Sequence, residues 1–146
     1  MDSKNTVSSF MDNTNEHGGN NFCSNWNYEW ELCNMLGQIE FKEKLNNVHN
    51  CYFSPRNNTK ERGSYMIEYR EGSFTTLHKD ASLKTEVTLL YKSDDLEGGD
   101  LIVDGKHIDM KVGDTYTYLP EQKHEVTDVK KGIRRVLISW FHKNNS

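Results

Sequence analysis

The sequence has few of the features that mark a membrane, secreted or disulfide-stabilised protein. Its 146 residues include only three cysteines, Cys23, Cys33 and Cys51. Because their number is odd and no C-x-x-C pair occurs, they predict free thiols in a reducing compartment. No apolar run approaches the ~20 residues of a membrane-spanning helix, and the polar start Met1–Asn5 lacks the apolar stretch of a secretory signal. These absences predict a cytoplasmic protein with no membrane partner.

An excess of positive charge is also absent. The chain has 18 Lys and Arg against 22 Asp and Glu, which gives a formal net charge of −4. This balance argues against nucleic acid as a general electrostatic partner. Hydrophobic residues make up 34% of the chain and charged residues 27%, which allows one modest core at this length.

The amino-terminal part divides into a polar segment and an apolar-striped one. Residues 1–24 are rich in Asn, Ser, Asp and Gly, so they bury too little apolar surface to offset their ordering entropy. We therefore predict a disordered polar tail over residues 1–24 and a single domain over residues 25–146. The domain should begin with a helix over residues 26–46, weakened at Gly37, because apolar residues recur at spacings of three to five: Trp26, Trp30, Cys33, Leu36, Phe41 and Leu45.

From Ser64 onward the sequence has the texture of short strands. Five segments are rich in β-branched and aromatic residues and are separated by turn signals: 65–69, 86–91, 100–103, 115–119 and 134–141. Asp104-Gly105 suits a type I′ hairpin turn. Many short strands at this spacing predict a mainly β protein, a double-sheet jelly roll whose mouth holds a ligand. Residues 50–63 are a candidate lid over that mouth.

Two histidines and one aspartate have the pattern of a metal site. His78 and Asp80 are two residues apart, so on a strand their side chains point to the same side. His124, 46 residues further on, would come from a distant strand. Two imidazoles and one carboxylate are the protein ligands of the facial triad that binds non-haem Fe(II) and leaves three positions open.

Several motifs surround these residues in a fixed order. Tyr69 to Asp80 reads Y-x-x-G-x-F-x-x-x-H-x-D, and further blocks follow at Glu97-Gly98-Gly99-Asp100, Val112-Gly113-Asp114, Leu119-Pro120, His124 to Val129, and Gly132, Arg134 and Trp140-Phe141. This succession, over about residues 65–141, resembles the 2-oxoglutarate/Fe(II)-dependent dioxygenases, in particular the prolyl-hydroxylase-like branch and the bacterial PKHD-type hydroxylases.

The resemblance implies a double-stranded β-helix with the helix packed outside one sheet. It also implies an enzyme that binds Fe(II) through His78, Asp80 and His124 and consumes 2-oxoglutarate and O2, with ascorbate as a candidate reductant. Such an enzyme hydroxylates an unactivated C–H bond and releases succinate and CO2. The substrate would be a peptide side chain, such as proline, or a small metabolite.

The resemblance further assigns a co-substrate site to Arg134, Tyr91 and Tyr69. Arg134 matches the family's position for the arginine that binds the remote carboxylate, which a planar guanidinium grips with two parallel donors. Tyr91 would share that carboxylate, and Tyr69 would lie near the iron-chelating end. If residues 134–141 form a strand, Arg134 faces the interior with Val136, Ile138 and Trp140, whereas the side chain of Arg135 lies outside.

Two other functions remain open at this point. One is a cupin-type metalloprotein that does not use 2-oxoglutarate, such as an isomerase or a thiol dioxygenase, although such proteins usually carry H-x-H where this chain has His78-Lys79-Asp80. The other is a non-catalytic jelly-roll binding module, whose mark would be a lost ligand or a lost arginine.

Overall fold

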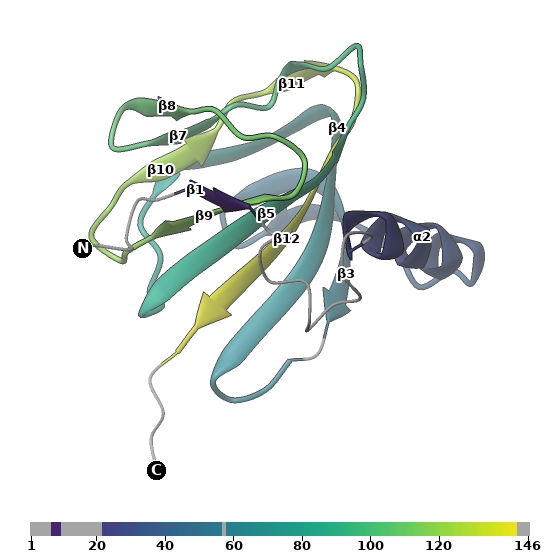
Figure 1. Ribbon diagram of the computed structural model, residues 1–146, viewed down its shortest axis with the longest axis horizontal. Coiled ribbons are helices and arrows are strands. Elements are labelled where there is room, and N and C mark those ends of the chain that lie inside the picture. The colour runs from purple at the N-terminus through teal and green to yellow at the C-terminus, as the bar shows by residue number, and fades with distance from the viewer. Residues whose placement is uncertain (1–6, 10–21, 57, 143–146) are drawn as a thin grey trace.

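The computed structural model describes residues 7–9, 22–56 and 58–142, which form a curled antiparallel sheet with one helix packed against its outside (Figure 1). This architecture confirms the prediction of a mainly β jelly roll with an amino-terminal helix. The elements are β1 (Val7–Ser9), α2 (Phe22–Met35), β2 (Glu40–Leu45), β3 (Val48–Arg56), β4 (Arg62–His78), β5 (Lys84–Lys92), β6 (Glu97–Gly98), β7 (Leu101–Val103), β8 (Lys106–Ile108), β9 (Asp114–Tyr118), β10 (His124–Val126), β11 (Val129–Lys131) and β12 (Arg134–Phe141).

Strand β4 joins the two layers of the roll. The main path of the sheet runs β1-β9-β5-β12-β4-β10-β7-β8, while β3 also pairs with β4 and β2 pairs with β3. The first half of β4 pairs with β12, from Arg62 opposite Phe141 to Tyr69 opposite Arg134. Its last residues pair with β10 instead, with His78 opposite His124. One long strand therefore places residues of both layers around the same interior.

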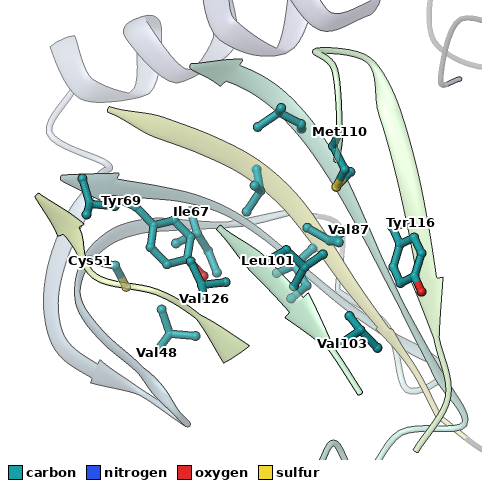
Figure 2. Close-up of a cluster of buried hydrophobic side chains, with 14 of the residues drawn as sticks. Val48, Cys51, Ile67, Tyr69, Val87, Leu101, Val103, Met110, Tyr116 and Val126 are labelled. Carbon is teal, nitrogen blue, oxygen red and sulfur yellow. The ribbon is translucent and has the colours of Figure 1, made fainter. Parts of the chain in front are cut away.

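The interior between the layers is apolar. Its buried residues come from strands far apart in sequence, among them Val48, Ile67, Val87, Leu101 and Val126. Figure 2 shows these side chains pointing from their strands into one shared space. The fold is thus closed by hydrophobic burial on the concave face of the sheet, which is also the face from which the polar residues of the site project.

Helix α2 covers part of the convex face. Trp30 is buried there against Met66 of β4 and Leu90 of β5, and the Arg135 guanidinium lies 5.6 Å from the Trp30 ring. The expected packing of the helix outside one sheet is confirmed. Within the described part of the chain, no helix is long and apolar enough to span a membrane.

The predicted helix over residues 26–46 is wrong in its second half. The helix ends at Met35, and residues 40–45 form strand β2, which pairs with β3. The reason lies at Gly37, whose φ of +74° is the left-handed conformation of a helix C-cap. The N–H of Gly37 donates to Asn34 O at 3.1 Å and the N–H of Gln38 to Cys33 O at 2.8 Å, the two bonds of a Schellman motif.

Two further expectations change in the structure. Residues 50–56 of the candidate lid belong to strand β3, which pairs with β4 as far as Arg56 and with β2 as far as Phe53, so this part of the segment is built into the sheet. Within the predicted tail, residues 7–9 form strand β1, which pairs with β9, and helix α2 already begins at Phe22. Residues 1–6 and 10–21 lie outside the described residues. The predicted Asp104-Gly105 hairpin is confirmed, with φ values of +52° and +78° between β7 and β8.

Candidate metal centre

His78, Asp80 and His124 meet where β4 and β10 run side by side. His78 ends β4 and lies directly opposite His124 of β10, and Asp80 follows two residues later in the connection to β5. Asp80 Oδ1 is 3.1 Å from His78 Nε2 and 3.3 Å from His124 Nε2. One donor atom from each of the three residues lies within 4.8 Å of the other two.

This spacing fits three neighbouring positions of an octahedral metal ion. With metal–ligand bonds of about 2.1 Å, two ligands at right angles are about 3.0 Å apart. The two Asp80 distances are close to that value. Two imidazoles with one carboxylate on one face is also the donor set that suits a divalent iron ion with open positions opposite. The residues present therefore fit the metal that the sequence predicted.

Backbone carbonyls orient both imidazole rings. His78 Nδ1 is 2.5 Å from the carbonyl oxygen of Thr76, and His124 Nδ1 is 3.2 Å from that of Gln122. A carbonyl accepts only, so each Nδ1 donates to it, and each Nε2 is the ring nitrogen turned toward Asp80 and the candidate metal position. Fixing the tautomer in this way is the usual arrangement around metal-binding histidines.

The second carboxylate oxygen of Asp80 is held by two donors. Thr85 Oγ1 donates to Oδ2 at 2.5 Å, and Trp140 Nε1 donates to the same atom at 3.2 Å. Oδ1 is thereby turned toward the histidines. Burial raises the pKa of Asp80, but hydrogen bonds from His124, His78 and Thr85 outweigh it and hold the pKa well below its usual range. The carboxylate is ionised at neutral pH, as a metal ligand must be.

The three residues line a cavity of about 820 Å³ inside the roll. Its deep walls are apolar, with Val87, Leu101, Val136 and Ile138 among them. A volume of this size is typical of sites for small organic ligands. The three candidate metal ligands thus face a space that can enclose a substrate.

Arg134 lines the same cavity and forms no salt bridge with any carboxylate of the described residues. Its side chain is buried, with 5% of the residue exposed, and its Nη1 atom has no hydrogen-bond partner among the described residues. Its guanidinium lies 5.3 Å from the ring of Tyr69, whose hydroxyl is 3.1 Å from Thr75 Oγ1. Burial lowers the pKa of Arg134, yet arginine keeps its charge in proteins. A buried cation with an unused donor is the expected form of a carboxylate-binding site.

The predicted role of Tyr91 does not fit its position. Tyr91 is 37% exposed, does not line the cavity, and stacks at 5.0 Å from the guanidinium of Arg135 on the convex face. A register shift in the pairing of β5 with β12 lies beside Arg135, so strict alternation does not apply at this point. Tyr69, by contrast, lines the cavity beside Arg134.

Sequence reasoning missed several residues of the site. Tyr118 is buried in the cavity wall, with its ring 4.0 Å from that of His124, and burial raises its pKa well above the usual value. Thr85 donates a hydrogen bond to Asp80, and the backbone carbonyl of Gln122 accepts one from His124. Neither Thr85 nor Gln122 belongs to a sequence motif that would have identified it. The only available signal for Tyr118 was its place in a strand six residues before His124.

No family model matches the sequence, and no curated protein matches it. Solved structures do resemble it. A prolyl-4-hydroxylase from Pseudomonas putida aligns with a TM-score of 0.69 and 14% identity over 96% of this chain and 92% of that chain. An oxidoreductase of the 2OG-Fe(II) oxygenase family from Burkholderia pseudomallei aligns with a TM-score of 0.57 and 14% identity over 80% and 81% of the two chains.

Proteins described as cupins share the fold as well. A cupin 2 conserved barrel domain protein from Rhodopseudomonas palustris aligns with a TM-score of 0.56 and 13% identity over 74% of this chain and 73% of that chain. At these identities the likeness shows the jelly-roll fold alone. Function has to be argued from the site itself.

Proposed function

We propose that the protein is an Fe(II)- and 2-oxoglutarate-dependent oxygenase that hydroxylates an unactivated C–H bond. The observation that carries the proposal is that one cavity holds both a His-Asp-His cluster and a buried arginine with an unpartnered donor. The first fits the metal, and the second fits the far carboxylate of a dicarboxylic co-substrate. The overall reaction converts substrate, O2 and 2-oxoglutarate into hydroxylated substrate, succinate and CO2.

Each residue of the site has a definite task in this proposal. His78, His124 and Asp80 would hold Fe(II), which when bound supplies the open positions and the redox chemistry for using O2. Thr85 and Trp140 keep Asp80 Oδ1 aimed at the metal by binding Oδ2.

The cavity wall would bind and enclose the organic reactants. Arg134 would bind the remote carboxylate of 2-oxoglutarate, with the Tyr69 ring beside its guanidinium. The apolar walls exclude water, which strengthens this charge pairing.

Asp80 also bears on the outcome of the reaction. A carboxylate ligand occupies the position that a halide needs in the related halogenases, which carry a small residue there. The chain therefore fits hydroxylation rather than halogenation.

The experiment that tests the proposal is succinate release by the purified protein with Fe(II), 2-oxoglutarate and O2. We expect slow turnover without a primary substrate, dependent on iron and abolished in His124→Ala. Binding of 2-oxoglutarate to the Mn(II)-loaded protein, followed by calorimetry, gives a second readout that needs no turnover. A protein that binds a metal but neither binds nor consumes 2-oxoglutarate would contradict the proposal and favour a cupin-type activity.

A further inference from the structure

The charges around the cavity are opposite in balance to those of the whole chain. Acidic residues outnumber basic ones in the sequence, 22 to 18. Among the described residues that line the cavity, however, Asp80 is the one carboxylate, while Lys44, Lys79 and Arg134 are cationic. Asp80 is already committed to the metal cluster through its contacts with both histidines.

Lys44 and Lys79 lie beside two connections of the fold that a backbone hydrogen bond joins. Lys44 lies near the end of β2, just before the Asn46-Asn47 turn into β3. The N–H of Thr76 donates to Asn47 O at 3.0 Å, which fixes that turn against the end of β4. Lys79 follows His78 at the same end. Both lysines are exposed, line the cavity and have no carboxylate partner within the described ranges.

The proposed metal and co-substrate leave these lysines unmatched. A divalent metal and Arg134 carry three positive charges, and Asp80 and dianionic 2-oxoglutarate carry three negative charges. The inner site is therefore neutral when loaded. What remains are the two ammonium groups of the exposed part of the cavity lining, referred to below as the rim, and their positive charge attracts an anion.

Part of the cavity wall is aromatic. Tyr65 and Trp140 line it with their ring centroids 5.6 Å apart, in an edge-to-face arrangement. Gly63 lines the cavity too, and a Cβ at that position would be 4.0 Å from Trp140 Cε3. An apolar ring or chain of a substrate can pack against this wall, with its polar end toward the lysines.

We propose that the primary substrate is a small organic acid with an apolar body, whose anionic group binds to Lys44 and Lys79 at the rim. This inference rests on the proposed function for the place of the co-substrate. It narrows the choice between a peptide and a small metabolite toward a free acid. The apolar body lies along Tyr65 and Trp140 and points its C–H bonds toward the metal cluster.

The test compares acids with their own amides, which differ chiefly in charge. The probes are phenylacetate with phenylacetamide, cyclohexanecarboxylate with its amide, and N-acetylproline with N-acetylprolinamide. Dissociation constants are measured by calorimetry and thermal shift on the Mn(II)-loaded protein at saturating 2-oxoglutarate, so that acids cannot take the Arg134 site. Two exposed ammonium groups should make the acid bind about three- to tenfold more tightly than its amide.

The test variant is the double substitution Lys44→Gln with Lys79→Gln at the rim. Its control is the double substitution Lys106→Gln with Lys130→Gln, at exposed positions outside the cavity. The rim variant should bring the acid-to-amide ratio close to one, and the other variant should keep it. The inference is overturned if no acid binds more tightly than its amide, or if the advantage survives in the rim variant. Whether 2-oxoglutarate alone raises the Tm reports separately on the proposed function.

Discussion

Two adjacent arginines on β12 occupy opposite faces of the same sheet and have opposite surroundings. On the convex face, Arg135 donates from Nε to Glu68 and from Nη2 to Glu31, both at 2.6 Å, and packs against the Trp30 ring. On the concave face, Arg134 is more deeply buried and its Nη1 has no partner in the described part of the protein. Arg135 is thus paired with two carboxylates, whereas the neighbouring Arg134 keeps a donor without a partner among the described residues.

The difference separates structural from functional charge. The Arg135 guanidinium is already paired with carboxylates, because its pair with Glu31 joins the sheet to α2 and its pair with buried Glu68 joins β12 to β4. A buried cation without a carboxylate is costly unless something else supplies the anion. Arg134 on the concave face therefore lacks an anion that a ligand could supply. We predict that changes on the concave face alter ligand binding and turnover, whereas changes to the ion pairs on the convex face alter stability.

The largest effect is expected at the metal cluster on the concave face. His124→Ala removes one of three ligands, so we expect loss of tight iron binding and of iron-dependent succinate release, with the fold retained. His107→Ala is the control, because His107 lies on the exposed β7–β8 hairpin, 3.4 Å from Asp100. Metal content, succinate yield and a circular dichroism melt are measured for both. Normal turnover by the His124 variant would contradict the triad.

The next largest effect concerns stability and the convex face. Glu68 is fully buried and accepts hydrogen bonds from Arg70 and Arg135, so Glu68→Ala removes the one buried carboxylate that these two guanidinium groups share. We expect a loss of about 3–5 kcal/mol in the free energy of unfolding. Glu86→Ala, which removes a partly exposed pair with Lys84, should cost no more than about 1 kcal/mol. Urea denaturation measures the free energy of unfolding of both variants. Equal losses would contradict the prediction that the buried Glu68 contributes more to stability than the partly exposed Glu86.

A smaller effect distinguishes the arginines directly. Arg134→Lys keeps the charge but loses the planar fork, so 2-oxoglutarate should bind about 1–3 kcal/mol more weakly. Arg135→Lys should leave that affinity unchanged and instead lower the free energy of unfolding by roughly 1 kcal/mol, because one ammonium cannot reach Glu68, Glu31 and Asn27 together. Calorimetric titration with 2-oxoglutarate decides, and a reversed pattern would mean that the two faces are assigned the wrong way round.

The sequence predicted the concave face better than the convex one, for physical reasons. Alternation along β12 correctly placed Arg134 with Val136, Ile138 and Trp140 on the cavity wall. The H-x-D spacing anticipated the cluster of His78 and Asp80, although Asp80 lies just beyond the strand, in the connection from β4 to β5.

Long-range pairing and local backbone irregularities were beyond such reasoning. The hydrogen bonds of Thr85 and Trp140 to Asp80 depend on how distant strands are brought together, which no local pattern encodes. The helix prediction failed past Gly37, because two apolar residues four apart fit a short strand as well as a helix. Tyr91 was misplaced by a register shift that the sequence does not reveal, and Tyr118, on the neighbouring strand β9, lines the cavity instead.

The smallest effect tests the two tyrosines that the sequence assigned to the co-substrate. Tyr69→Phe removes the hydroxyl that bonds Thr75 beside Arg134, so 2-oxoglutarate should bind weaker by about 0.5–1.5 kcal/mol. Tyr91→Phe keeps the ring that stacks on Arg135 and should change neither the affinity nor the Tm. Calorimetry on the two single variants and on the double variant measures the difference. If Tyr91→Phe weakens 2-oxoglutarate and Tyr69→Phe does not, the co-substrate does not bind on the concave face beside Arg134. The separation of the two faces into functional and structural would then fail.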